Sequence, residues 1–128
     1  MALILADTDV LIDALNGLEP ATGRVARELR AGALATTTVT VFELLSGVGT
    51  EAEKETVRKL LTPIRVFSFD EAAARSAAEI RRDLEKKGRA IDMADYLIAG
   101  IAASGSATLI TRNRAHFERV PGLRVESP

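Results

Sequence analysis

Four groups of polar side chains in this sequence have the types and positions that a metal-dependent reaction needs. In chain order they are Asp7-Thr8-Asp9, Glu43, Asp92 with Asp95, and Thr111-Arg112-Asn113. Each group stands where a predicted strand ends or a predicted helix begins. In parallel α/β sheets such positions meet at one edge, where the following helices start. If the carboxylates converge there, their like charges repel one another unless a cation lies among them.

The kinds of ligand in these groups limit which cation fits. The chain has no cysteine and one histidine, which excludes thiolate sites and sites with paired imidazoles. Hard carboxylate oxygens favour Mg²⁺ or Mn²⁺ over Zn²⁺. Mg²⁺ keeps several waters that a substrate phosphate can replace, and a metal so placed can polarise a phosphodiester and activate a water. The residues therefore predict metal-dependent phosphodiester hydrolysis.

The elements that must position these groups alternate between short apolar runs and helical patterns. Strands are predicted at 3–6, 34–38, 65–69, 107–110 and 123–125, and helices at 10–15, 20–31, 40–48, 51–61, 71–87 and 92–103. This alternation predicts one α/β domain over residues 1–128, with a mainly parallel sheet covered on both faces. The aromatic side chains Phe42, Phe67, Phe69 and Phe117 are expected in its core.

Each acidic group also has a purely structural interpretation. Asp7 or Thr8 can cap a helix, because a short oxygen-bearing side chain satisfies free backbone N–H groups. Thr40-x-x-Glu43 has the form of a capping box, and Asp92-x-x-Asp95 is a looser version of it. Asp95 resists this interpretation best, because it is the only charge between Met93 and Ala103 on an otherwise apolar helix and burial of an unpaired carboxylate is costly. We therefore expect Asp95 to have a partner.

Composition excludes several classes of protein. The 17 Lys and Arg residues balance 18 Asp and Glu, which argues against nucleic-acid binding by an overall positive field but not against a local site. No apolar run reaches the roughly 20 residues that span a bilayer, so a membrane protein is not expected. The sequence start lacks the pattern of a signal peptide, and we expect a cytoplasmic protein.

Four motifs together resemble a known family. They are Leu5-Ala6-Asp7-Thr8-Asp9-Val10-Leu11-Ile12-Asp13, Thr40-Val41-Phe42-Glu43-Leu44-Leu45-Ser46-Gly47, Asp95-Tyr96-Leu97-Ile98-Ala99, and Leu109-Ile110-Thr111-Arg112-Asn113-Arg114-Ala115-His116-Phe117. Their order and spacing resemble PIN-domain ribonucleases, and more narrowly VapC toxins of toxin–antitoxin pairs. The resemblance implies a PIN-like three-layer α/β/α sandwich and an endoribonuclease dependent on Mg²⁺ or Mn²⁺. It also implies a homodimer and a tightly bound VapB-like antitoxin.

The resemblance assigns roles residue by residue. Asp7, Glu43 and Asp95 match the three invariant acids, of which the first and third are the usual direct metal ligands. Asn113 falls where many PIN domains have a fourth Asp, which removes one negative charge. Asp9 and Asp92 are additional acids that could restore that charge.

Other side chains near these acids carry weaker predictions. Thr8 and Thr111 could donate hydroxyl groups to the carboxylates or to a phosphate. Arg112, Arg114 and His116 form a basic segment after the fourth strand, where RNA phosphates could dock. A solvated loop is the structural alternative for this segment.

Two other functions remain open from the sequence. A haloacid-dehalogenase-like phosphotransferase also begins with an apolar strand and Asp-x-Asp, but Leu11 and the absence of any Lys after Lys87 depart from its pattern. A non-catalytic α/β binding module would use the acids only as helix caps.

Overall fold

Five short parallel strands form the centre of the molecule. The computed structural model describes residues 2–128, and across them the strands follow the spatial order β3-β2-β1-β4-β5. The strands are β1 (Ile4–Ala6), β2 (Leu34–Thr37), β3 (Arg65–Phe67), β4 (Thr108–Ile110) and β5 (Val125–Glu126). All four neighbouring pairs are parallel, as the alternating pattern predicts.

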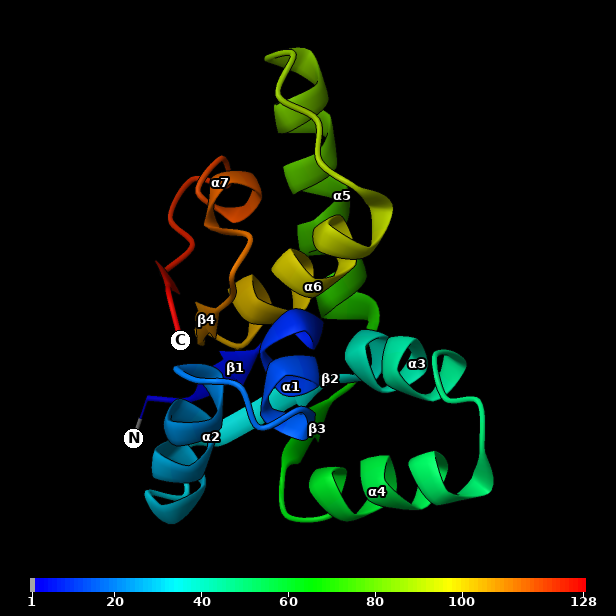
Figure 1. Cartoon of the computed structure of the whole chain (residues 1–128). Helices are drawn as coiled ribbons and strands as arrows, with labels where there is room; N and C mark the ends of the chain where they lie inside the picture. Colours follow the sequence, from blue (N-terminus) through cyan, green and yellow to red (C-terminus); the bar gives the residue numbers. More distant parts are fainter. Residues whose placement is uncertain (1) are drawn as a thin grey trace.

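Seven helices in the described residues connect and cover these strands (Figure 1). They are α1 (Thr8–Leu15), α2 (Ala21–Arg30), α3 (Thr38–Ser46), α4 (Glu51–Leu61), α5 (Glu71–Lys86), α6 (Met93–Ser104) and α7 (Arg114–Phe117). The short helix α7 was not predicted, because a single turn within a basic segment carries little periodicity. No helix within residues 2–128 is both long and apolar enough to cross a membrane.

The sheet separates two apolar cores, because successive side chains of a strand point to opposite faces. Leu5, Ala35 and Leu109 lie side by side in register and pack on the core that includes α5 and α6. Ala6 and Ile110 are paired on the other face and pack on the core that includes α1 and α2. These two cores and the sheet between them form the expected three-layer α/β/α sandwich.

Strand β1 lies where the order of the strands reverses, and this places the edge that carries the acids. From β1 the chain moves to β2 on one side, and it returns to β4 on the other. The carboxyl ends of β1, β2 and β4 are therefore neighbours, and in sheets of this kind ligands bind at such a reversal point. The backbone N–H of Asp7 donates to Ile110 O at 3.0 Å, so the acid begins at the last rung between β1 and β4.

Close packing of α5 against α6 fixes the helix that carries Asp95. A Cβ atom added at Gly100 would lie 2.6 Å from Ala73 O and 2.7 Å from Ala77 Cβ, closer than real Cβ atoms approach such neighbours. The absence of a side chain at this position lets the two helices meet. Asp70 caps α5 by accepting a hydrogen bond from the backbone N–H of Ala73, as predicted.

The aromatic side chains were only partly predicted correctly. Phe117 is fully buried, as expected. Phe42 is 69% exposed and Phe69 is 36% exposed, so the expectation that both belong to the core is wrong. Phe42 lies on the outer face of α3, and Phe69 follows the edge strand β3, where no further strand covers it.

Candidate active site

Asp7 lies at the centre of the polar edge of the sheet. Its Oδ1 accepts a hydrogen bond from the backbone N–H of Thr8 at 2.8 Å, which caps α1, and its Oδ2 accepts one from the Thr111 hydroxyl at 2.7 Å. The residue is only 6% exposed. Asp7 therefore caps α1, as the capping interpretation predicts. It is also a buried carboxylate that accepts a hydrogen bond from the end of the neighbouring strand.

The segment after β4 is fastened to the two acids at the start of α1. The Thr111 hydroxyl accepts the backbone N–H of Asn113 at 2.9 Å and lies 3.4 Å from Asp9 Oδ2. The Asp9 carboxylate accepts a hydrogen bond from the backbone N–H of Arg112, at 3.3 Å to Oδ1 and 3.1 Å to Oδ2. The Asp9 carboxylate therefore holds this segment against the site, and Thr111 lies where the sequence places a hydroxyl donor.

Glu43 does not take part in the capping box that its spacing suggests. Helix α3 begins at Thr38, and its cap is Thr37, whose hydroxyl accepts the backbone N–H of Thr40 at 3.0 Å. Glu43 instead accepts a hydrogen bond from the Thr8 hydroxyl at 2.6 Å. The capping interpretation of Glu43 is wrong, and the side chain joins α3 to the start of α1 at the same edge as Asp7.

Asp95 has the partner that its place on an apolar helix requires. His116 Nδ1 lies 2.9 Å from Asp95 Oδ2, and the Asn113 amide nitrogen lies 2.9 Å from the same ring nitrogen. Asp92 is the cap residue of α6 but makes no side-chain capping hydrogen bond, so the looser capping box does not form. Asp95, Asn113 and His116 therefore meet, although they come from α6, the segment after β4, and α7.

The carboxylates at this edge carry uncompensated charge. Burial, followed by the negative charge of Asp9, raises the pKa of Asp7 from 3.8 to about 6, although hydrogen bonds from Thr111 and Thr8 lower it. Burial also raises the pKa of Asp9 and of Asp95. His116 lowers the pKa of Asp95 and Arg112 lowers that of Asp9, whereas Asp92 and Glu43 raise that of Asp95 further. Among residues 2–128, no Lys or Arg side chain forms an ion pair with any of these five acids. A divalent cation would supply the missing positive charge.

The arginines of the basic segment form their ion pairs with acids outside the site. Arg112 pairs with Asp13 at 2.7 Å, and Arg114 pairs with Glu118 at 2.7 Å. Both guanidinium groups remain about half exposed. The Arg114–Glu118 pair is exposed on both sides and contributes at most about 1 kcal/mol, so Arg114 can exchange its partner for a phosphate. The Asp13 side chain of the other pair is only 16% exposed.

The roles of two residues at the site, Thr40 and His116, could not be predicted from the sequence pattern. Thr40 is fully buried, and its hydroxyl lies 3.0 Å from that of Thr8, which extends the link between α1 and α3. The signal was the threonine-rich run at 36–40, which also reads as an ordinary β-branched strand end. His116 was undervalued because its position depends on α7, whose single turn brings residues 113 and 116 to one side.

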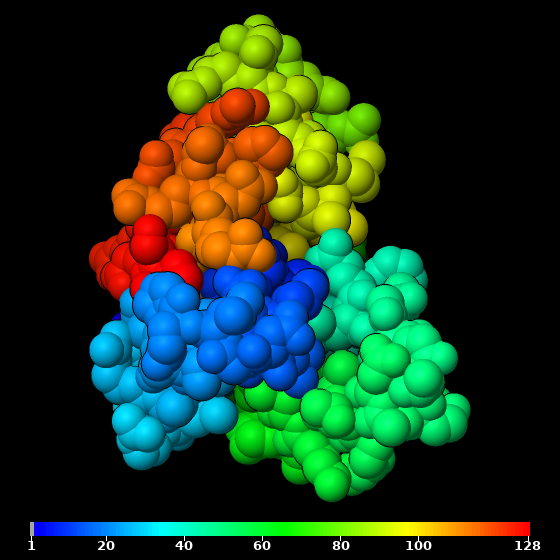
Figure 2. Space-filling model, viewed as in Figure 1, coloured from blue at the N-terminus to red at the C-terminus, as the bar shows by residue number. Residues whose placement is uncertain are grey.

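A groove leads away from Glu43 between α1, α3 and α4. It has a volume of about 420 Å³, and Glu43, Glu53, Thr56 and Asn16 are its polar lining residues. The apolar lining comprises Ile12, Leu15, Leu44, Val48 and Val57. Figure 2 shows the surrounding face, with α1 on the surface between the 110–117 segment and α3. The acids therefore lie next to an apolar surface as well as to the basic segment.

The raised pKa of Asp7 generates a prediction about stability in the absence of metal. Folding raises the pKa of Asp7 from 3.8 to about 6, so the folded protein binds the proton of Asp7 more tightly than the unfolded chain does. The free energy of unfolding therefore contains a contribution that is fully present below about pH 4 and is lost as pH rises through about 6. Asp7→Asn removes this dependence. In a chelator, we expect the variant to gain on the order of 2 kcal/mol over wild type between pH 4 and pH 7.5. Urea unfolding across this range measures the difference.

The control for this measurement is Asp83→Asn, which removes an exposed acid paired with Lys87 on α5. It should follow the wild-type pH profile. A constant offset between Asp7→Asn and wild type at every pH would show that Asp7 ionises normally in the folded protein.

Comparisons with known proteins agree with this arrangement. Residues 4–123 match the PIN domain family. The chain is 32% identical over 130 residues to the tRNA(fMet)-specific endonuclease VapC of Shigella flexneri, covering 98% of each sequence. It is 36% identical over 122 residues to ribonuclease VapC10 of Mycobacterium tuberculosis, covering 95% of this chain and 91% of the relative.

Solved structures show the same fold over the whole length. The chain matches VapBC of Salmonella typhimurium bound to DNA with a TM-score of 0.86 and 27% identity, over 99% of this chain and 98% of the other. VapBC2 of Rickettsia felis bound to a promoter DNA fragment gives a TM-score of 0.90 at 24% identity, over 98% of each chain. The chain therefore belongs to the PIN-domain family, among its VapC-type ribonucleases.

Proposed function

We propose that this ribonuclease is an Mg²⁺-dependent endoribonuclease that hydrolyses RNA phosphodiester bonds and is neutralised by a VapB-like antitoxin. One observation carries the proposal: Asp7, Glu43 and Asp95 come from separate elements to one edge of the sheet, and within residues 2–128 no Lys or Arg pairs with them. Carboxylates gathered without a cationic side chain match the ligand set that Mg²⁺ or Mn²⁺ prefers.

Asp7 and Asp95 are the proposed direct ligands, with Glu43 and the Asn113 side chain beside them. Asn113 contributes no charge, which leaves Asp9 and Asp92 as the additional acids of the site. Asp9 is already engaged by the backbone N–H of Arg112, so its main role is to position that segment. The Asp92 carboxylate is exposed and makes no capping hydrogen bond.

The residues of the chain supply orientation and proton transfer in this proposal. When bound, the metal supplies Lewis acidity and lowers the pKa of a coordinated water. Thr8 holds one oxygen of Glu43 by its 2.6 Å hydrogen bond, which leaves the other oxygen to receive the proton of the attacking water. Thr111 holds Asp7 Oδ2, so that both acids keep fixed orientations.

RNA is the proposed substrate, bound in the cytoplasm through its phosphates. Arg112 and Arg114 lie on the segment that carries Asn113, and both side chains are about half exposed. The exposed pair of Arg114 with Glu118 can exchange for phosphate. His116 lies between this segment and Asp95. The Shigella flexneri relative is named as a tRNA(fMet)-specific endonuclease, so tRNA is the first RNA class to test.

We expect purified protein to cleave RNA only when Mg²⁺ or Mn²⁺ is present. Asp7→Asn and Asp95→Asn should each lower the cleavage rate by at least about 100-fold, because each removes a charged ligand from the metal. Gel analysis of a tRNA mixture, with and without chelator, measures the rate. Asp83→Asn is the matched control, since it removes one exposed acid far from the site, and it should cleave at the wild-type rate. Undiminished cleavage by either site variant, or in chelator, would refute the metal-site assignment.

The proposed antitoxin contact is the groove between α1, α3 and α4. Its apolar lining fits an apolar segment of a partner, and Glu43 at its end brings that segment next to the acids. One structural relative is a toxin-antitoxin complex from Klebsiella pneumoniae. Occupation of this groove would block access to the site.

A charged side chain introduced into the groove should weaken binding of the antitoxin without changing the rate of RNA cleavage. Ile12 lines the groove and is 41% exposed, so Ile12→Glu should fold normally and bind the protein encoded beside this one at least about tenfold more weakly. Leu18→Glu, at an exposed apolar position outside the groove lining, is the control. Isothermal titration calorimetry gives both affinities. Equal affinity for the two variants would place the antitoxin elsewhere.

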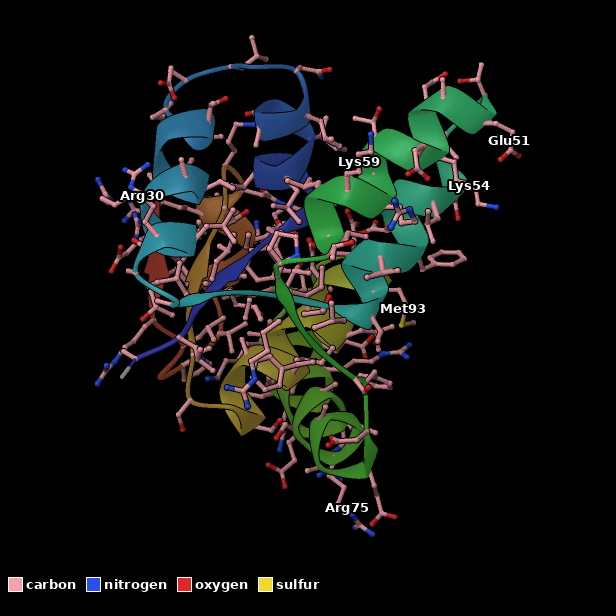
Figure 3. All side chains as sticks on the ribbon, turned by 90° about the horizontal axis from the view of Figure 1, so that it is seen from below. Arg30, Glu51, Lys54, Lys59, Arg75 and Met93 are labelled. Carbon is pink, nitrogen blue, oxygen red and sulfur yellow. The ribbon has the colours of Figure 1, made fainter. Side chains whose placement is uncertain are left out.

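We also propose that two copies associate through the apolar face of α3, β3 and the start of α6. Its exposed members are Phe42, Leu45, Val66, Phe69 and Met93, and Figure 3 shows Met93 beside α3.

Light scattering should give twice the chain mass of 13.7 kDa for wild type and the single mass for Phe42→Glu. A monomeric wild type would contradict this.

A further inference from the structure

Asp92, Asp95 and His116 bring three ligand atoms together beside the proposed metal ligands. These atoms all lie within 4.8 Å of one another. Neighbouring ligands of a six-coordinate cation with bonds of about 2.1 Å lie about 3 Å apart. The 2.9 Å between His116 Nδ1 and Asp95 Oδ2 already has this spacing.

The Asn113 amide turns its nitrogen toward both Asp95 Oδ2 (3.5 Å) and the His116 ring. In this amide orientation, the hydrogen bonds of His116 leave one unfavourable contact whichever nitrogen of its ring carries the proton. If Nδ1 carries the proton, it donates to Asp95 but faces the N–H groups of the Asn113 amide, 2.9 Å away. If Nδ1 carries a lone pair, it accepts from Asn113, but that lone pair then faces the Asp95 carboxylate. A cation between Nδ1 and the carboxylate would remove the second conflict.

The fold holds the imidazole in place and leaves the Asp92 carboxylate free to bind a ligand. Phe117 directly follows His116 and is fully buried, which anchors α7. Arg119 donates to Ala90 O at 2.8 Å and fastens the end of α7 to the segment before α6. Asp92 begins α6 without a side-chain capping bond, so its carboxylate is not engaged by the helix it starts.

We propose that Asp92, Asp95 and His116 form a second cation subsite that shares Asp95 with the first. The imidazole makes this subsite different from one built of oxygens alone. Nitrogen ligands favour first-row transition cations, whereas Mg²⁺ prefers oxygen. The subsite therefore takes a transition cation of the Mn²⁺ to Zn²⁺ series ahead of Mg²⁺. The proposal rests on the proposed function only in that Asp95 also serves the first metal.

The sole histidine of the chain makes a direct test feasible. We expect Mn²⁺ bound to full-length protein without a histidine tag to show a nitrogen coupling in pulsed electron paramagnetic resonance. The coupling should change from the ¹⁴N to the ¹⁵N pattern when only histidine is ¹⁵N-labelled. It should disappear in His116→Gln. Bound Mn²⁺ without histidine coupling in wild type would overturn the subsite, whatever the variant does.

Affinity for metal provides the second measurement. His116→Gln should lower the affinity for Co²⁺ at least about tenfold while changing the affinity for Mg²⁺ less than about threefold. Glu118→Gln, two residues after His116 but paired with Arg114, should change neither. Equal losses for Co²⁺ and Mg²⁺ in His116→Gln would overturn the proposal and leave His116 as a residue that positions Asp95.

These readouts separate the subsite from the proposed function. A histidine coupling in a protein that does not cleave RNA supports the subsite and refutes only the ribonuclease proposal. Metal-dependent RNA cleavage without a histidine coupling refutes only the subsite.

Discussion

The repulsion among the acids around Asp7 is the interaction on which the rest of the site depends. A carboxylate that is 6% exposed has lost most of its hydration, and its acidic neighbours increase the cost of ionisation. The hydrogen bonds from Thr111 and Thr8 recover only part of that cost, since the pKa of Asp7 still stands at about 6. An acid kept at this buried position without a cationic side chain lowers the stability of the metal-free fold. The arginines next to the site instead pair with Asp13 and Glu118.

Threonines hold this charged edge together. Thr8 joins Glu43 to α1, Thr40 lies against Thr8, and Thr111 joins Asp7 to the segment after β4. Hydroxyl groups can orient a carboxylate without cancelling its charge, because they carry no charge themselves. The reversal of strand order at β1 brings these three segments together, and the close approach of α5 and α6 at Gly100 fixes the helix that carries Asp95.

The spacing of apolar residues and the positions of capping and turn residues were enough to predict most of the fold. The strands at β1, β2 and β4, helix α4 and the Asp70 cap follow from apolar runs and capping residues close in sequence. The placement of Asp7, Glu43 and Asp95 at one edge of the sheet was also predicted, because parallel strands share their carboxyl edge. The hydrogen bond from Thr8 to Glu43, the turn of α7 and the contact between His116 and Asp95 were not predicted, since they depend on packing between distant segments. The PIN fold and the ribonuclease relatives rule against a dehalogenase-like phosphotransferase and leave no reason to regard the acids as helix caps alone.

The most direct test of this account is the pKa of Asp7 measured by carboxyl carbon NMR, without metal and with saturating Mg²⁺. We expect a value of about 6 without metal and a clear fall when Mg²⁺ is added, because a bound cation favours the ionised carboxylate. An Asp7 pKa near 3.8 in both conditions would show that the acids do not form a site in need of a cation, and would contradict the account.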